Sequence, residues 1–448
     1  MCRQEVPVLV ELHVERFKSF REARLPLAEL TVLIGANASG KSNLLEALQL
    51  LSWLARGRRL SEILYALRDR QLDVRGPLHR LAYAGASSFT LGGVFKDESA
   101  SQLLLKSEVA IRDDGLCVDY ERAEELGAED AFLYGVFAHS DGGVLRVAYD
   151  CSGEDAPSID DPDADVVACT DQQAVFTQLT TPARFSSTYK RAQERIPQAA
   201  RQIQVALESI LFLDPLPRRM RDYSFTVERT LQGDGSNLSA VLYDLCEKQQ
   251  RKAEVLAFVR SLPEQNILDL TFLTGPRGEV MVQLTESFGG KAQTYEAALL
   301  SDGTLRVLAV AAALHSVPEG SLVVIEEIDN GVHPTRAKLL LDNIQRVARE
   351  RKLRVLLTTH NPALLDAIPV DAIPDVVACY RNPKEGDSRL MPLRQLQDYP
   401  ELMAQGPVGQ LVTRGILERY LKSPKGPEEK AAQAQKVLEM LQSPAGES

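Results

Sequence analysis

The sequence predicts an α/β fold with a mostly parallel core sheet and flanking helices, an antiparallel β lobe and a helical insertion. Three apolar runs, at Thr31–Ile34, 321–325 and 354–357, have the length of buried parallel strands, and each leads into polar residues. Residues 87–150 hold several short candidate strands separated by turns. Residues 171–265 carry helical patterns, so we expect an insertion between the two halves of the core sheet.

The chain length of 448 residues predicts about two or three domains. We expect the first half of the core with the β lobe at 1–170, the helical insertion at 171–265, the second half of the core at 266–392, and C-terminal helices with a tail at 393–448. Candidate strands in the lobe are 88–94, 102–111 and 116–121, with a hairpin turn at 113–115. A helix with a break near Pro197 is expected at 187–211.

Composition excludes several classes of protein. No apolar run approaches the roughly 18 residues that span a bilayer, and the first residues lack a secretory pattern, so we expect a cytoplasmic protein without a membrane contact. Six scattered cysteines without C-x-x-C spacing favour buried, reduced thiols over a zinc site or disulfides. The net charge of −11 indicates that any contact with nucleic acid is local or made by a partner.

A phosphate-binding loop is predicted at Gly35–Ser42, which fits G-x-x-x-x-G-K-[ST] between a strand and a helical pattern. The two glycines allow the turn that points backbone N–H groups at phosphate oxygens. Lys41 should reach the β- and γ-phosphates of ATP, and the Ser42 hydroxyl should ligate Mg²⁺. The alternative, a glycine-rich turn with a chance lysine, is disfavoured by the flanking elements. The expected nucleotide-binding residues here are Gly35, Ala36, Asn37, Ala38, Ser39, Gly40, Lys41, Ser42 and Asn43.

Further candidates lie in the second half of the chain. Ser301 and Gly303 precede a helix whose first N–H groups can bind an anion, although the same pattern suits a turn and cap before a buried helix. Glu326 and Glu327 end the apolar strand at 321–325. We interpret Glu326 as an Mg²⁺ ligand, acting through water, and Glu327 as the general base that activates the attacking water. The alternative is that both acids only solvate the end of a strand.

Three charged stretches stay open at this point. Arg56–Arg59 and Arg218–Arg221 are candidates for a DNA or partner contact, or else for a solvated helix face and a structural turn. The acidic stretch 151–165 lacks the spacing of a calcium loop, which favours a solvated loop over an ion site.

Taken together, the motifs resemble the RecF/SMC/OLD-like group of ABC-type AAA ATPases. The resemblance rests on five features: Phe17-Lys18-Ser19-Phe20, the phosphate loop, Leu300–Arg306, the strand at 321–325 with its two acids, and His360. Leu300–Arg306 resembles the L-S-G-G-Q signature of ABC-type ATPases, and the strand with Glu326 and Glu327 resembles their Walker B motif. It covers residues 8–54 and about 285–380. It implies that His360 is the switch histidine that senses the γ-phosphate, and that Ser301 and Gly303 act across a dimer interface. The chain departs from the family at Asp302, where glycine is usual, and at Glu326, where aspartate is usual.

Two details of the resemblance remain open. His333 before Pro334 either belongs to a family pattern near the dimer axis or simply forms a turn. The Gln-bearing loop of ABC-type heads has no clear counterpart. OLD nucleases carry a Toprim domain after the switch histidine, and we expect none here because little chain follows and no D-x-D strand end is present.

The resemblance implies an ATPase that binds ATP and Mg²⁺, forms a homodimer around the nucleotide, and acts on DNA or for a separately encoded effector such as a nuclease. Bacterial defence and DNA repair are the tasks it suggests. Two alternatives belong to other classes: the ATPase subunit of a transport system, and a nucleotide-controlled scaffold that does not hydrolyse ATP.

Overall fold

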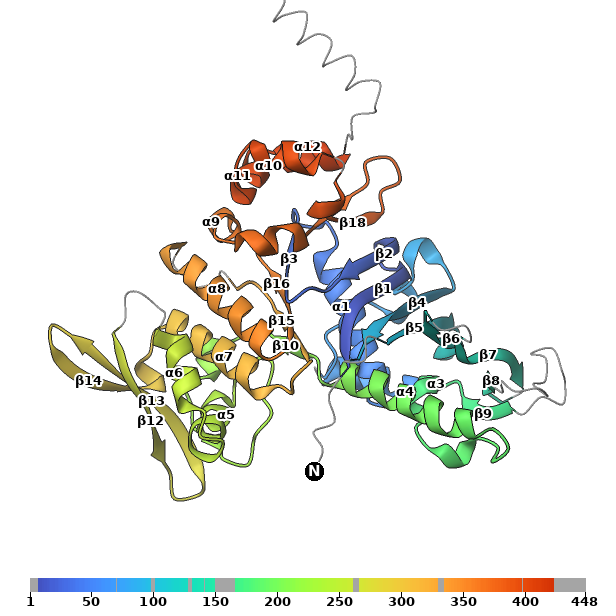
Figure 1. Ribbon diagram of the computed structural model, residues 1–448. Helices are drawn as coiled ribbons and strands as arrows, with labels where there is room; N and C mark the ends of the chain where they lie inside the picture. Colours follow the sequence, from blue (N-terminus) through green and yellow to red (C-terminus); the bar gives the residue numbers. More distant parts are fainter. Residues whose placement is uncertain are drawn as a thin grey trace, which may run out of the picture.

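The computed structural model describes residues 7–69, 71–97, 101–127, 131–140, 142–149, 166–260, 266–328, 334–396 and 398–422. Figure 1 shows a sheet at the centre, an antiparallel lobe to its right, a group of helices to its left and a small helical unit above it. The predicted parallel core and antiparallel lobe are both confirmed.

The core sheet is parallel except at one edge. Within the described ranges it has six strands in the order β10-β15-β16-β3-β17-β18, and β18 is antiparallel to β17. Their bounds are Leu211–Leu213 for β10, Leu322–Ile325 for β15, Arg354–Thr358 for β16, Leu30–Ile34 for β3, Val376–Arg381 for β17 and Ser388–Pro392 for β18. Ile325 pairs with Leu357, and Thr358 pairs with Leu33. The carboxyl ends of β15, β16 and β3 therefore lie level at one edge of the sheet.

The side chains of the core strands alternate between two hydrophobic cores. Leu33 and Val324 belong to a core shared with the β lobe and helix α1 (Lys41–Ala55). Val32 and Val323 belong to a second core on the other face. Each strand buries both faces, which explains why the sequence shows continuous apolar runs here instead of alternation.

The β lobe is an antiparallel sheet beside the core. Among the described residues it has eight strands in the order β2-β1-β4-β5-β6-β7-β8-β9. Their bounds are Val8–Phe17 for β1, Phe20–Pro26 for β2, Ser88–Lys96 for β4, Gln102–Arg112 for β5, Gly115–Leu126 for β6, Phe132–Ser140 for β7, Val144–Tyr149 for β8 and Val166–Thr170 for β9. The three predicted strands lie within β4, β5 and β6, and the predicted hairpin turn joins β5 to β6.

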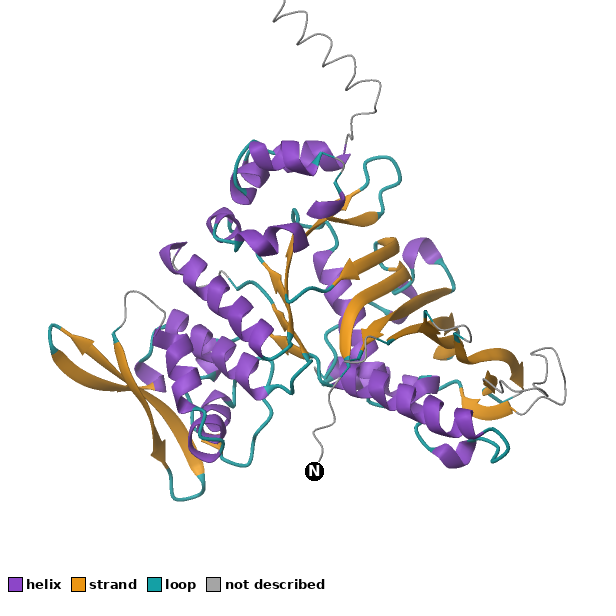
Figure 2. Ribbon diagram, viewed as in Figure 1, coloured by secondary structure: helices purple, strands orange, loops and turns teal. Residues whose placement is uncertain are grey.

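Helices cover both faces of the core sheet (Figure 2). On the lobe side these are α1, α2 (Ile63–Arg68), α3 (Val175–Gln178) and α4 (Lys190–Glu208). On the other side they are α5 (Leu238–Tyr243), α6 (Lys252–Arg260), α7 (Asp302–Ser316) and α8 (Pro334–Glu350). The expected break at Pro197 is wrong, because α4 continues through the proline. Ile196, Ala200 and Ile203 anchor this helix in the first core, which offsets the hydrogen bond that proline cannot donate.

Residues 171–265 do not form one separate helical unit. Helix α4 packs on α1, β10 lies within the core sheet beside β15, and α5 and α6 pack in the second core. The predicted domain boundaries stay a prediction.

A narrow sheet and a C-terminal helical unit complete the fold. The sheet consists of β11 (Ser224–Phe225), β12 (Ile267–Thr274), β13 (Glu279–Phe288) and β14 (Lys291–Glu296). The helices after β16 are α9 (Pro362–Asp366), α10 (Tyr399–Ala404), α11 (Val408–Thr413) and α12 (Ile416–Lys422). In the part of the chain that the structure describes, no helix has the length and apolar character that a membrane crossing needs. The described cysteines, Cys117, Cys169, Cys246 and Cys379, are buried and free, as predicted.

Candidate nucleotide site

The phosphate loop connects the end of β3 to the start of α1. Gly35 has a φ of +154° and Gly40 a φ of +120°, backbone conformations that favour glycine. A Cβ at Gly35 would lie 2.2 Å from the carbonyl oxygen of Cys379, and a Cβ at Gly40 would lie 2.4 Å from Ser388 Oγ. Both glycines are therefore required by conformation and by the close approach of β17 and β18.

Lys41 lies folded over the loop. Its Nζ donates to the carbonyl oxygens of Gly35 at 2.6 Å and Ala36 at 3.1 Å. Burial lowers the pKa of Lys41, while the nearby Cys379 and Glu327 act in the opposite direction. Glu327 thus lies within electrostatic reach of Lys41, although the two residues come from opposite halves of the sequence.

A hydrogen-bond network, which we call the serine collar, fixes the loop from behind. It consists of Ser19, Asn43, Ser388 and the backbone of Ser39. Ser388 Oγ donates to the Ser39 carbonyl oxygen at 2.6 Å and lies 2.8 Å from Ser19 Oγ, to which Asn43 Nδ2 also donates at 2.8 Å. Sequence reasoning missed Ser388, since nothing in the run Asp387–Arg389 signals a contact with a loop so distant in the chain.

A second network links α1 to the segment that follows α2. Arg75 Nε donates to Glu46 Oε1 at 2.6 Å, and Lys18 forms an ion pair with the same carboxylate. Glu46 is buried, so the two cations satisfy a carboxylate that has little access to water. Lys18 and Ser19 both belong to the predicted Phe17–Phe20 motif, which gives that motif a role beyond core packing.

Glu326 and Glu327 follow β15 at the edge where the parallel strands end. The Glu327 N–H donates to Thr358 Oγ1 at 3.0 Å, and the Ile328 N–H donates to the Thr358 carbonyl oxygen at 3.3 Å. Glu327 has a φ of +46°, a left-handed conformation that costs about 1–3 kcal/mol in a residue other than glycine. The bonds to Thr358 hold this turn, and the Glu327 side chain is exposed at the edge.

Further carboxylates lie around Glu326. Burial, together with the nearby Asp214, Asp73 and Glu327, raises the pKa of Glu326 to about 7. Burial likewise raises the pKa of Asp214, against the nearby Arg306. Asp214 directly follows β10 and is another strand-end residue at this edge, which sequence reasoning missed because β10 has only three residues.

The signature-like segment begins helix α7. Ser301 is its N-cap, and Ser301 Oγ accepts from the Thr304 N–H at 3.1 Å. Asp302 pairs with Arg221 at 2.6 Å, and Arg221 also donates to the Leu300 carbonyl oxygen at 3.0 Å. Ser301 is exposed and Gly303 half-buried, so both can be reached from outside the protomer.

His360 lies just beyond β16 and is exposed. The next residue, Asn361, begins helix α9, where its Oδ1 accepts from the Ala363 N–H at 3.0 Å. Because β16 lies between β15 and β3, His360 shares one sheet edge with the phosphate loop and with Glu327. The structure thus brings together the first- and second-half candidates of the sequence, and their chemical roles stay predictions.

The residues fit ATP and Mg²⁺. Ser39 Oγ is buried without a hydrogen-bond partner inside the loop, and Ser42 is exposed at the start of α1. Among the described residues, no three carboxylate, histidine or cysteine side chains form a ready-made metal site. Ser42 and Glu326 are the residues that would hold Mg²⁺, together with phosphate oxygens, since this ion is usually bound by few protein ligands plus substrate phosphates. His333 and the acidic stretch 151–165 lie outside the described residues.

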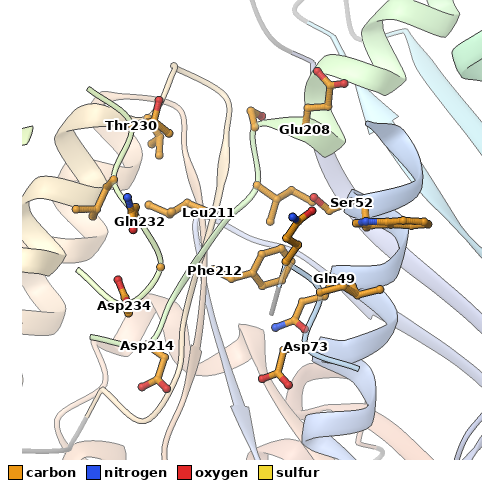
Figure 3. Close-up of a pocket in the computed structure, with 18 of the residues that line it drawn as sticks. Gln49, Ser52, Asp73, Glu208, Leu211, Phe212, Asp214, Thr230, Gln232 and Asp234 are labelled. Atoms are coloured by element: carbon orange, nitrogen blue, oxygen red, sulfur yellow. The ribbon is translucent and has the colours of Figure 1, made fainter. Parts of the chain in front are cut away.

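A cavity of about 1240 Å³ adjoins the carboxylates. Figure 3 shows Asp73 and Asp214 together at one end, with Gln49 and Ser52 projecting from helix α1. Glu326 also lines the cavity, so the cavity reaches the carboxyl edge of the core sheet from this side.

The two arginine-rich stretches meet at the same cavity. Arg56 and Arg218 line it, and Arg219 pairs with Asp234 at 2.6 Å. The acidic residues of the lining are Asp69, Asp73, Glu208, Asp214, Asp234 and Glu326. Because these acids outnumber the arginines, the cavity does not favour a polyanion such as DNA.

Comparisons with known proteins point to one family. Residues 8–112 match the family described as "AAA ATPase domain", and residues 180–366 match an AAA domain family whose description names the AbiEii toxin of a Type IV TA system. The DNA replication and repair protein RecF of Synechococcus sp. (strain JA-2-3B'a(2-13)) is 40% identical over 80 residues, 17% of this chain and 20% of that protein. Structural maintenance of chromosomes protein 1 of Arabidopsis thaliana is 36% identical over 74 residues, 15% of this chain and 6% of that protein.

These matches support an ABC-type ATPase of the RecF/SMC-like group. This is a group of ATP-hydrolysing enzymes, and the resemblance stated from the motifs is confirmed. The match spans a fifth or less of the length of each of these two relatives. Among solved structures, an SMC head domain bound to the C-winged helix domain of ScpA aligns over 86% of this ATPase and 98% of that chain, with 12% identity and a TM-score of 0.46.

Proposed function

We propose that this protein binds ATP with Mg²⁺ and hydrolyses it at the carboxyl edge of the core sheet. The observation that carries the proposal is the register of β3, β15 and β16, which brings the phosphate loop, Glu327 and His360 to one edge. The backbone N–H groups of the loop and Lys41 bind the phosphates, and Mg²⁺ neutralises charge on them. Glu327 accepts the proton of the attacking water, and His360 contacts the γ-phosphate.

The proposed dimer follows from the position of the signature-like segment. Ser301 and Gly303 belong to the opposite side of the core sheet from α1, and Arg221 holds their loop through Asp302. In this proposal they complete the site of a second copy, closing the pair around ATP, and hydrolysis opens it again. The protein then acts in the cytoplasm as a switch on DNA, or for an effector encoded separately, in defence or repair. The similarity to a DNA replication and repair protein and to a structural maintenance of chromosomes protein supports DNA as the substrate class.

The substitution Glu327→Gln tests the catalytic assignment. We expect kcat to fall by about 10²- to 10⁴-fold, because the amide cannot accept the proton, while ATP still binds. Glu350→Gln, on the exposed surface of α8, is the matched control and should leave kcat unchanged. Turnover of Glu327→Gln at the wild-type rate would show that Glu327 is not the base. A wild-type protein without turnover would favour the non-hydrolysing scaffold.

Sedimentation of Glu327→Gln tests the proposed switch, because the blocked variant should accumulate the closed pair. We expect dimers with ATP and monomers without it, and DNA should shift the equilibrium further toward dimers. Monomers under all conditions would contradict the dimer, and no effect of DNA would favour a protein effector.

A further inference from the structure

The C-terminal helical unit packs directly on the segment that carries His360. Helix α9 begins at Pro362, two residues after His360, and α11 lies against it (Figure 1). A Cβ at Gly409 of α11 would lie 2.1 Å from the carbonyl oxygen of Pro362. This distance leaves no room for a side chain, so the two backbones touch at this point.

A side-chain acceptor at the surface adds hydrogen bonds to the contact. Asp366, the last residue of α9, accepts at Oδ1 from the Gly409 N–H at 2.7 Å and from the Gln410 N–H at 3.3 Å. Leu365 of α9 and Leu411 of α11 lie in the same hydrophobic core. The position of α11 on α9 is therefore specified by packing, by hydrogen bonds and by backbone contact together.

The segment between α9 and β16 leads from this contact to the catalytic edge. The Asn361 N–H donates to Thr359 Oγ1 at 3.1 Å, and Thr358 receives the bonds from Glu327 and Ile328 described above. The backbone of His360 is joined to the end of β16 on one side and, through Asn361, to the start of α9 on the other. A displacement of Pro362 must then change the position of the His360 backbone.

We propose that α11 positions the switch histidine: the contact between Gly409 and Pro362 sets where His360 stands relative to the nucleotide. Gly409 and Asp366 are positioning residues in this scheme, and His360 is the residue that touches the phosphate. The inference rests on the proposed ATP hydrolysis. It also means that a ligand or partner bound to α10–α12 can alter the hydrolysis rate without reaching the nucleotide.

The first experiment replaces Gly409 by alanine. The added methyl group pushes α11 away from Pro362, and we expect kcat to fall by about 10-fold or more with ATP affinity within about 2-fold of the wild type. The matched control is Gly415→Ala in the same unit, where a Cβ meets no atom within 4 Å. Gly415 has a φ of +64°, so this variant loses some stability while kcat should stay unchanged. Equal kcat losses in both variants would overturn the proposal.

A double-mutant cycle with His360→Ala separates positioning from general loss of structure. If Gly409 acts through His360, adding Gly409→Ala to His360→Ala should lower kcat by less than about 2-fold further. The same fold loss in both backgrounds would overturn the inference.

Two substitutions of Asp366 provide a second test, which decides the question even if Gly409→Ala does not fold. Asp366→Asn retains an oxygen acceptor and should hold kcat within about 2-fold of the wild type, whereas Asp366→Ala should reproduce the loss. Identical kcat for both variants would overturn the inference, with the proposed function intact. A wild-type protein that hydrolyses no ATP would overturn both.

Discussion

Replacing Ser388 by alanine removes one hydroxyl from the serine collar behind the phosphate loop. Ser388 is fully buried, and its hydroxyl bonds the Ser39 carbonyl oxygen at 2.6 Å and Ser19 Oγ at 2.8 Å. Two net hydrogen bonds are worth about 1–3 kcal/mol, so we expect the free energy of unfolding to fall by that amount.

ATP affinity should fall as well, because Ser39 belongs to the loop that binds the phosphates. In the variant, part of the binding free energy is used to order the loosened loop. If this costs about 1 kcal/mol, the Kd for ATP rises about 5-fold. The measurements are urea denaturation for stability and titration with a fluorescent ATP analogue for Kd.

Ser52→Ala is the matched control. Ser52 is also a buried serine, on α1, and its hydroxyl donates to the Leu207 carbonyl oxygen at 2.8 Å, away from the loop. It should lose about 1 kcal/mol of stability with an unchanged Kd. The reasoning is refuted if Ser388→Ala binds ATP within about 2-fold of the wild type, or if Ser52→Ala weakens binding equally.

Two further variants probe buried and interfacial charge. Glu121 is fully buried, where it accepts from the Val175 and Phe176 N–H groups, and burial raises its pKa from 4.5 to about 7. The folded state then binds more protons than the unfolded state between about pH 4.5 and 7, so stability falls as pH rises through this window, by up to about 3 kcal/mol. Denaturation at several pH values should show this slope in the wild type and its absence in Glu121→Gln; parallel curves would contradict the assignment. Arg221→Ala removes the pair with Asp302, which is half exposed and worth less than about 1 kcal/mol of stability. Arg221→Ala should nonetheless weaken ATP-dependent dimerisation, measured by sedimentation, whereas Arg219→Ala should not. Equal dimerisation of the two variants would contradict a role of Arg221 in holding the signature-like segment.

Sequence analysis could predict those parts of the candidate site whose conformation depends on residues within one short segment. The phosphate loop needs glycine at positions 35 and 40 and a helix start at Lys41, and each requirement is local. Glu327 and His360 could be found because a buried parallel strand that ends in polar residues points to the carboxyl edge of a sheet. The order of these segments along the chain then predicted that they form one site.

The remainder depends on contacts between distant segments, which no local pattern contains. Ser388 reaches Ser39 because β18 pairs with β17 and its first residue, Ser388, then lies against the loop. Asp214 joins the site because a strand of three residues, too short for a periodicity signal, lies beside β15. Pro197 misled the helix prediction, since tertiary packing of α4 outweighs the local preference.

The core strands pack into two hydrophobic cores, one on each face of the sheet, with Leu33 facing one core and Val32 the other. A polypeptide that ends before residue 266 would lack β16 and β17, the two neighbours of β3, and also α7 and α8, which belong to the core that Val32 faces. We therefore expect that neither this fragment nor the complementary fragment from residue 266 onward folds by itself. The two fragments should reassemble when they are co-expressed. Splitting the gene in this way would turn nucleotide binding into a reporter of fragment association.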